Sequence, residues 1–460
     1  MKTGLFCGNY DRGINLAVTN IDGAFGAVDG VRGRLARKCR AVAPRAAHYL
    51  GPQDAAILYD PLPREYADYC AKLYGFTPRT FAPKRRAFRL ADEDGFPIAE
   101  HSLSIMDDLF DDGDLCYEIS FEGRAKGWTI SPFIQHESVY EFGQCTGLPV
   151  GGMEEAHVRS GRVVDLNNKA LFQNACRKLG VPVAKEAEHV RGWGNVLKAA
   201  QRCFDKYRAV MLRQACGAGG LGNLAVTGED LERERCPTLY QQLETHLAGH
   251  AGWDTDTVLV EPLYRDVVCS PAVLCYIAPA GTVSVVAESV QVLRDHAFLG
   301  SIIPSGLDQR VVARVTEDTV KYAEWAASRG ARGYINVDWL LRTEGELLAC
   351  ESNYRFTAAV HPSMIRDRLV GAESAAIAWS NDALHVPATV SFDRVLGHLD
   401  NRGIGWDPKR GEGIIVTIPP AEGSMGYVAL AKTPDEAARM NTVMAELETE
   451  HAGHTAQETN

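Results

Sequence analysis

Two acidic side chains, an amide and a guanidinium lie close together in the sequence between residues 338 and 355. Asp338 stands in an apolar run, a Thr-Glu-Gly turn follows at residues 343–345, and Glu351, Asn353 and Arg355 come next at alternate positions. This pattern predicts a hairpin, and alternate residues of a strand point to the same face. Carboxylate and amide oxygens suit magnesium beside nucleotide phosphates, and an arginine can neutralise a transferring phosphoryl group or an oxyanion. The four side chains therefore predict a magnesium–triphosphate site; the alternative is a salt-bridged surface hairpin.

A glycine-rich loop precedes this pattern by about 120 residues. Residues 217–222 read GAGGLG, which fits the spacing G-x-G-x-x-G. A dinucleotide-binding loop would be followed by a helix, but residues 223–227 (NLAVT) are typical of a strand. A strand–loop–strand flap can instead close its backbone N–H groups over nucleotide phosphates. We therefore predict a phosphate flap, with a plain hairpin turn as the alternative, and its agreement with the acidic hairpin strengthens both interpretations.

The elements that position these residues follow from apolar periodicity and from turn residues. Helices are expected over residues 64–74, 167–179, 194–207, 237–247, 315–328, 392–399 and 434–447. Strands are expected over residues 55–59, 209–213, 223–227, 258–261, 333–342, 346–351, 413–419 and 426–431, with two more inside 272–292.

Length and composition limit the class of protein. A chain of 460 residues predicts two to four structural units, and a net charge of −11 argues against nucleic acid as a partner. Residues 267–287 have the length of a membrane span, but their central Pro-Ala-Gly-Thr predicts two strands and a turn. The first residues contain no secretory apolar segment, and the twelve cysteines have no metal-binding spacing. We therefore expect a cytoplasmic protein with reduced thiols and no membrane partner.

From about residue 165 to 365, the sequence resembles the ATP-grasp superfamily. In that family a lysine opens the first helix, and Asn168-Lys169 is similar to it. A second lysine usually ends the strand before the flap, where this chain has Arg213, which keeps the charge and adds a planar fork. Residues 258–264 (VLVEPLY) look like the strand that holds adenine.

The resemblance implies roles for particular side chains. It assigns nucleotide binding to Lys169, Arg213, Gly219, Gly220, Gly222, Glu261, Leu263 and Tyr264, and two magnesium ions to Asp338, Glu351 and Asn353. Either Glu261 or Asp266 would hold the ribose, and Arg355 is similar to a catalytic arginine. Some amino-acid ligases of the family have another arginine where this chain has Asn336; Arg294 or Arg332 could replace it.

The resemblance implies an α/β (α+β) ATP-grasp fold in three parts. These are a pre-ATP-grasp domain (residues 1–160), the ATP-grasp domain (161–385), and a small α/β domain with a polar tail (386–460). The layout is similar to a branch that makes amide bonds in bacterial natural-product pathways, including the pheganomycin-type peptide ligase and γ-glutamyl ligases of unusual amino acids.

The activity implied is ATP-dependent joining of an amino-acid or peptide carboxylate to an amine through an acyl phosphate, with ATP and Mg²⁺. The alternatives are loading of an amino acid onto a carrier-protein thiol and an ATP-binding regulatory protein without catalysis. Small-molecule substrates are the expected partners, and a homodimer is the default oligomer.

Three further segments have weaker functional interpretations. The acidic run at residues 107–114 predicts a solvated turn, because it lacks the ligand spacing of a calcium loop. The basic run at residues 32–45 is expected to be a helix face that serves solubility or an internal interface, with a carrier-docking patch as the alternative. His361 is expected to pack or to form hydrogen bonds, with a general-base role as the alternative.

Overall fold

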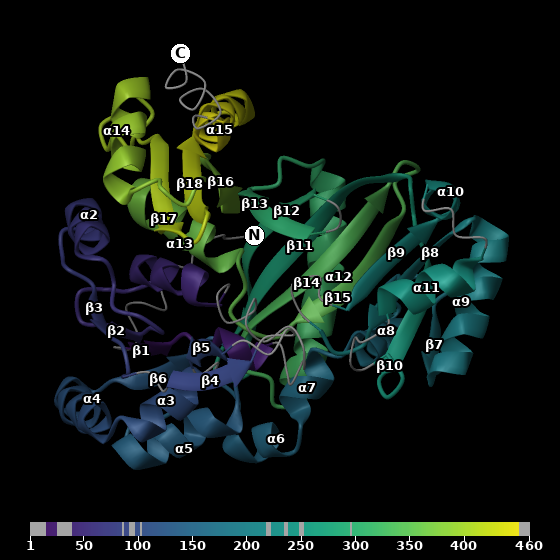
Figure 1. Cartoon of the computed structure of the whole chain (residues 1–460), viewed down its shortest axis with the longest axis horizontal. Coiled ribbons are helices and arrows are strands. Elements are labelled where there is room, and N and C mark those ends of the chain that lie inside the picture. Colours follow the sequence, from purple (N-terminus) through teal and green to yellow (C-terminus); the bar gives the residue numbers. More distant parts are fainter. Residues whose placement is uncertain are drawn as a thin grey trace.

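The computed structural model describes residues 15–24, 39–84, 87–91, 97–101, 104–217, 222–233, 238–247, 253–294 and 297–449. Figure 1 shows three regions of mixed helix and strand. One is N-terminal, one lies around strands β7 to β10, and one is a large sheet that runs from the centre of the molecule into its C-terminal part. This is the α/β fold that the sequence predicts.

The N-terminal region is a small parallel sheet with helices around it. Its strand order is β3-β2-β1-β6, from β1 (Asn15–Val18), β2 (Ala55–Ile57), β3 (Arg79–Phe81) and β6 (Thr129–Pro132). The helices include α2 (Arg64–Tyr74), α4 (Gly113–Lys126) and α5 (Glu137–Thr146), and β4 (Ala87–Ala91) pairs with β5 (Pro97–His101). All three residues of β2 are buried, as expected for a parallel strand covered on both faces.

The acidic run at residues 107–114 is helical, so the predicted solvated turn is wrong. It spans α3 (Ile105–Asp111) and the start of α4, and Asp108 and Asp112 are buried. The Asp112 carboxylate accepts a hydrogen bond from the backbone N–H of Leu115 and so caps α4. Aspartate is favoured both in turns and at helix N-caps, and composition alone did not separate the two.

The second region is an antiparallel sheet of order β7-β10-β8-β9. It contains β7 (Glu188–Arg191), β8 (Ala209–Gln214), β9 (Asn223–Thr227) and β10 (Thr257–Pro262). Helix α9 (Trp193–Tyr207) packs on it through Val196 and Phe204, and α10 (Gly228–Arg233) and α11 (Leu239–Leu247) lie nearby. The predicted strand–glycine loop–strand arrangement is confirmed by β8 and β9.

The third region is one eight-stranded antiparallel sheet of order β15-β14-β11-β12-β13-β16-β18-β17. Its strands are β11 (Val267–Ile277), β12 (Val283–Arg294), β13 (Ala297–Ile303), β14 (Gly333–Arg342), β15 (Leu347–Asn353), β16 (Ile377–His385), β17 (Gly413–Ala421) and β18 (Ser424–Ala431). Helices α8 (Lys169–Leu179) and α12 (Gln309–Ala327) bury Phe172 and Tyr322 against it.

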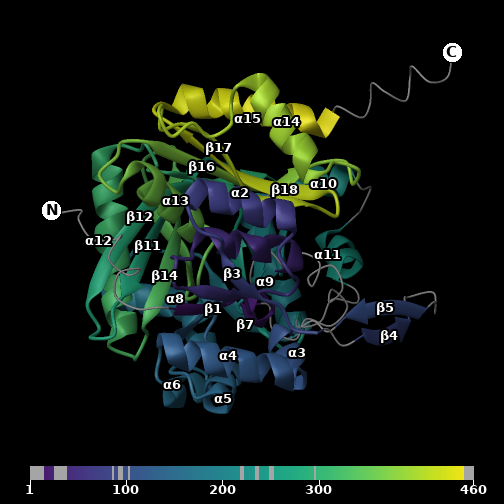
Figure 2. The same cartoon turned by 90° about the vertical axis from the view of Figure 1, so that its left-hand side faces the viewer.

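The remaining helices complete the core and the C-terminal part. They are α6 (Glu155–Arg159), α7 (Arg162–Leu166), α13 (Val360–Val370), α14 (Phe392–Arg402) and α15 (Pro434–Thr449). In Figure 2, α14 and α15 lie across the strands of the C-terminal part. Because β16, β17 and β18 continue the large sheet, the last predicted unit shares hydrogen bonds with the central one. The domain boundaries at 160 and 385 stay predictions.

Two predictions from composition have structural counterparts. Residues 267–287 form β11, a turn and the first part of β12, as expected. No helix within the described ranges is long and apolar enough to cross a membrane. The ten cysteines that the structure describes are all free thiols.

Candidate active site

The hairpin of β14 and β15 brings the acidic and amide side chains together. In its register Asp338 pairs with Glu351 and Asn336 pairs with Asn353. The Asp338 carboxylate accepts hydrogen bonds from Asn336 (2.6 Å), Asn353 (2.8 Å) and Gln291 of β12 (2.9 Å). Asp338 and Asn353 are each only 8% exposed. Asp338, Glu351 and Asn353 therefore lie together on the hairpin, with Asp338 and Asn353 buried and Glu351 26% exposed, whereas Arg355 lies two residues beyond β15.

Two cations, Lys169 of α8 and Arg213 of β8, lie close to Glu351. The Lys169 ammonium lies 3.2 Å from its carboxylate, and a guanidinium nitrogen of Arg213 lies 3.9 Å from the same oxygen. Lys169 is the first residue of α8, whose N-cap Asn168 accepts hydrogen bonds from the backbone N–H groups of Ala170 and Leu171. The ammonium also donates to the Gly217 carbonyl at 2.8 Å, which joins the helix start to the base of the glycine loop.

Arg213 is also paired with Glu261 across β8 and β10. Two guanidinium nitrogens contact one Glu261 oxygen at 2.7 and 2.9 Å, and both partners are almost completely buried. The other Glu261 oxygen accepts a hydrogen bond from Gln173 of α8, which in turn contacts His189 of β7 at 2.9 Å. The strand that the resemblance assigns to adenine is thereby tied to α8 and to Arg213.

Burial and charge shift the pKa values at this cluster in opposite directions. Burial, followed by repulsion from Glu351, raises the pKa of Asp338 above its ordinary value. Burial opposes ionisation of Glu351 as well, but Lys169, Arg213 and Arg355 outweigh it and hold its pKa below the ordinary value. Two close carboxylates repel each other unless a cation lies between them. Their oxygens, with the neighbouring Asn353 amide, are the hard donors that magnesium prefers, so these residues fit the metal.

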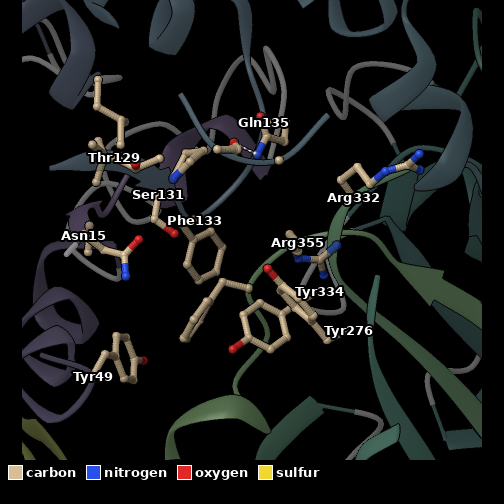
Figure 3. Close-up of a pocket in the computed structure, with 18 of the residues that line it drawn as sticks. Asn15, Tyr49, Thr129, Ser131, Phe133, Gln135, Tyr276, Arg332, Tyr334 and Arg355 are labelled. Carbon is tan, nitrogen blue, oxygen red and sulfur yellow. Dashed lines mark hydrogen bonds between the residues drawn. The ribbon is translucent and has the colours of Figure 1, made fainter. Parts of the chain in front are cut away.

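Arg355 lies between this cluster and a large cavity. One of its guanidinium nitrogens donates to the Asn167 side-chain oxygen at 3.0 Å. Burial lowers its pKa, and Glu351 and Asp338 oppose that effect. The cavity has a volume of about 530 Å³. It lies between the N-terminal sheet and the end of the large sheet where β11 ends and β14 begins. Figure 3 shows Arg355, Tyr334 and Tyr276 on one side of the cavity and Asn15 and Ser131 of the N-terminal region on the other.

The other predicted residues occupy different positions. Gly219 and Gly220 lie outside the described residues, and Gly222 has a positive φ of 80° and accepts a hydrogen bond from the Gln214 N–H. Leu263 and Tyr264 follow β10, where the Arg342 guanidinium lies 4.5 Å from the Tyr264 ring centre.

The ribose and second-arginine alternatives can also be located. Asp266 is paired with Arg342 at 3.0 Å, away from the buried cluster that contains Glu261. Arg294 is exposed at the end of β12, and within the described ranges it has no ion pair with the acidic cluster. Arg332 donates to the carbonyls of Pro279, Ala327 and Ala331. Neither Arg294 nor Arg332 contacts Asp338 in the described structure.

Sequence reasoning missed the polar residues that support the cluster. Gln173, Gln291 and Asn167 come from three separate elements and carry no motif of their own. Asn336 was noted only as the place of a missing arginine, whereas its amide donates directly to Asp338. Alternation along β14 places Asn336 and Asp338 on one face, and that signal could have identified Asn336.

Two of the weaker candidates are buried. His361 is fully buried, and its ring lies 3.2 Å from the Asp382 carboxylate, as expected for a packing histidine. Arg45 is buried and paired with the same aspartate at 3.3 Å. The end of the basic run is therefore not a docking surface, and residues 32–38 lie outside the described residues.

Comparisons with known proteins agree with this geometry. Residues 394–443 match the family described as the PGM1 C-terminal domain. The L-propargylglycine–L-glutamate ligase of Streptantibioticus cattleyicolor is 30% identical over 343 residues, which cover 67% of this chain and 68% of that protein.

Solved structures show the same fold at low sequence identity. A biotin carboxylase from Campylobacter jejuni matches with a TM-score of 0.55 at 14% identity, covering 96% of this chain and 92% of that one. An ADP complex of N5-carboxyaminoimidazole ribonucleotide synthetase matches with a TM-score of 0.54 at 12% identity, covering 95% and 97%. By the identity and coverage of its relative and by its fold, the chain belongs to the ATP-grasp carboxylate–amine ligase superfamily.

Proposed function

We propose that this protein is an ADP-forming ligase that joins the carboxylate of one amino acid or peptide to the amine of another, using ATP and two magnesium ions. The observation that carries the proposal is the order of charged and polar groups around the hairpin of β14 and β15. Lys169 and Arg213 flank Glu351, Asp338 and Asn353 follow, and Arg355 borders the cavity. Alternate residues of a strand are ~7 Å apart, so side chains on one face of β15 can contact successive phosphates of a triphosphate.

This order gives each side chain a task in the proposed chemistry. Lys169 and Arg213 would hold the α- and β-phosphates, where a positive charge is needed and both cations are already fixed by buried partners. Asp338, Glu351 and Asn353 would bind magnesium, which supplies charge neutralisation for phosphoryl transfer. Arg355 would then face the γ-phosphate on one side and the substrate carboxylate on the other.

The proposed reaction has two steps. A carboxylate oxygen attacks the γ-phosphorus, the bond to the bridging oxygen breaks, and ADP leaves with that electron pair. The amine then attacks the acyl carbon, phosphate leaves, and the amine loses a proton. A partly buried arginine beside the reacting carbon can stabilise the oxyanion of this second step, because such contacts strengthen away from water.

The relative supports an amino acid as each substrate, since its name specifies L-propargylglycine and L-glutamate. Two structural neighbours are complexes with ADP, one of them with its magnesium salt, which supports the nucleotide and the metal. A place in natural-product biosynthesis and a cytoplasmic location remain parts of the proposal.

The test is ADP and phosphate release from ATP and Mg²⁺ with pairs of amino acids, followed by mass spectrometry of the products. We expect a product that weighs one water less than its two substrates. Glu351→Gln should lower turnover by about 10²-fold or more, because it removes charge that a transition state needs. Glu344→Gln, on the exposed turn of the same hairpin, is the matched control and should keep full activity. Release of AMP and pyrophosphate would contradict the acyl-phosphate route, and ATP binding without turnover would favour a regulatory protein.

A further inference from the structure

The cavity beside Arg355 is lined by aromatic rings from five separate segments. Tyr276 of β11 and Tyr334 of β14 are a cross-strand pair with ring centres 5.1 Å apart. Phe356 lies 5.2 Å from Tyr334, 4.6 Å from Tyr49 and 6.3 Å from Phe133. These five rings, the aromatic wall, form one connected series, and all of them line the cavity.

A backbone hydrogen bond fixes the two sides of this wall together. The Phe356 N–H, just after β15, donates to the Phe133 carbonyl, just after β6, at 2.8 Å. The wall therefore joins the N-terminal sheet to the strand that carries Glu351 and Asn353. A rigid apolar surface lies directly beside the predicted phosphoryl-transfer site.

Three of the polar side chains that line the cavity are held by partners within the protein, among them its only carboxylate in the described lining. Thr19 donates to the Ile57 carbonyl, and Gln135 donates to the Gly151 carbonyl and accepts from Tyr140. Asp54 accepts backbone N–H bonds with both oxygens, from Asn15 and Gly51. These groups have little capacity left to recognise a polar ligand side chain.

The two arginines at the cavity differ in how many hydrogen bonds their guanidinium groups already make within the protein. Arg332 donates to three backbone carbonyls, two of them near the end of α12, and Figure 3 shows its guanidinium directed away from the rings. In the described part of the chain, Arg355 has one hydrogen-bond partner, Asn167, and it lines the same cavity as Tyr334 and Tyr276. The cavity therefore offers one guanidinium, which suits a ligand with one carboxylate.

We infer that the cavity binds an amino acid with an apolar side chain, aliphatic or aromatic, whose only carboxylate pairs with Arg355 while its side chain packs against the aromatic wall. This inference rests on the ligase function proposed above and names the class of one of its two substrates. A volume of about 530 Å³ is within the range of about 300–1,000 Å³ typical of small-molecule sites. A second carboxylate, as in glutamate, would meet rings instead of a cation, and an amide side chain would lose its hydrogen bonds to water.

Leucine and asparagine provide the first test, because they are similar in size and differ in polarity. Binding of L-leucine, L-phenylalanine, L-asparagine and L-glutamate is measured by calorimetry on the full chain with ADP and Mg²⁺. We expect leucine or phenylalanine to bind about tenfold or more tightly than asparagine and glutamate, as a hydrophobic pocket discriminates. Equal or tighter binding of asparagine or glutamate would overturn the inference.

Variants of Tyr334 locate the selectivity. Tyr334→Gln should reduce the leucine-to-asparagine ratio of affinities about tenfold, whereas Tyr334→Phe, which keeps the ring, should preserve it. Phe133→Gln should act like Tyr334→Gln, since its backbone carbonyl remains to accept the Phe356 N–H. Tyr117→Gln is the matched control, because that ring is 74% exposed on α4. An unchanged ratio in both glutamine variants would contradict the inference, and a ratio is independent of the fraction of folded protein.

The two proposals can fail separately. If apolar amino acids bind with the expected preference but no pair of amino acids yields ADP and product, the ligase function fails and the cavity assignment stands. If ADP and a condensed product form equally well with polar amino acids in both positions, the ligase function stands and the cavity assignment fails.

Discussion

Replacing Arg213 tests how the nucleotide-binding region is held together. Its guanidinium contacts Glu261 at 2.7 and 2.9 Å, lies 3.9 Å from Glu351, and is about 10% exposed. Removing one partner of a buried ion pair leaves the other charge without compensation, which costs about 3–5 kcal/mol. Arg213→Met keeps most of the side-chain volume, so we expect the free energy of unfolding to fall by about this amount.

Two companion variants separate charge from shape. Arg213→Lys keeps a positive charge but cannot reach both acids, so we expect a smaller loss of about 1–2 kcal/mol. Arg202→Met is the matched control, because Arg202 contacts Glu188 at 2.6 Å with 59% and 42% of the two side chains exposed. Exposed pairs contribute about 0–1 kcal/mol, so this variant should be close to neutral.

Urea unfolding followed by tryptophan fluorescence measures the three variants, with and without ATP and Mg²⁺. Arg213→Met should also lose most of the stabilisation that the nucleotide gives, since ligand stabilisation scales with affinity. Arg213→Lys should keep most of it, because the ATP-grasp family usually has a lysine at this position. Equal costs for Arg213→Met and Arg202→Met would refute the reasoning, and so would unchanged nucleotide stabilisation in Arg213→Met.

Two further predictions concern stability. Asn168→Ala removes the N-cap of α8 and should cost about 1 kcal/mol by urea unfolding, whereas Asn168→Ser should recover most of that loss. Burial, followed by repulsion from His361, lowers the pKa of His48 to about 3, while its two ring nitrogens contact Tyr66 and Tyr74. The unfolded chain binds that proton more readily, so stability present above about pH 6.5 should be lost as the pH falls toward 3, by at most about 5 kcal/mol. His48→Gln should flatten this part of the stability–pH curve, and an unchanged slope would contradict the assignment.

The central part of the site could be predicted from the sequence because its information is local. Alternation from Glu351 to Asn353 fixes which side chains share a face, and the turn before β15 fixes the partner strand. Likewise, the β-rich residues after the glycine loop were enough to predict a second strand instead of the helix that a dinucleotide-binding loop needs. In each case one short segment and its turn determine the geometry, and the structure has both arrangements.

The N-terminal region was much harder to predict. The strands of its parallel sheet have only three or four residues, too few for a period of two to be recognised, and several were missed. The helix capped by Asp112 was mistaken for a turn because the same residue type serves both. Fold class and secondary structure of the central region therefore followed from the sequence, whereas the packing of the first 160 residues did not.

The substrate cavity shows why such packing matters for function. Each ring of the aromatic wall is ordinary in its own segment, and an isolated phenylalanine such as Phe133 predicts only a core residue. The wall exists because the N–H of Phe356, which follows β15, meets the Phe133 carbonyl from a distant part of the chain. Arg355 lies next to that junction, so a residue predicted from a local motif faces a pocket that no local motif encodes. Within this family the chemistry can therefore stay with the hairpin while the substrate changes with the N-terminal region. Substitutions at Phe133 should accordingly alter the preferred amino acid and leave the KM for ATP unchanged, whereas substitutions at Glu351 should reduce turnover for every amino acid alike.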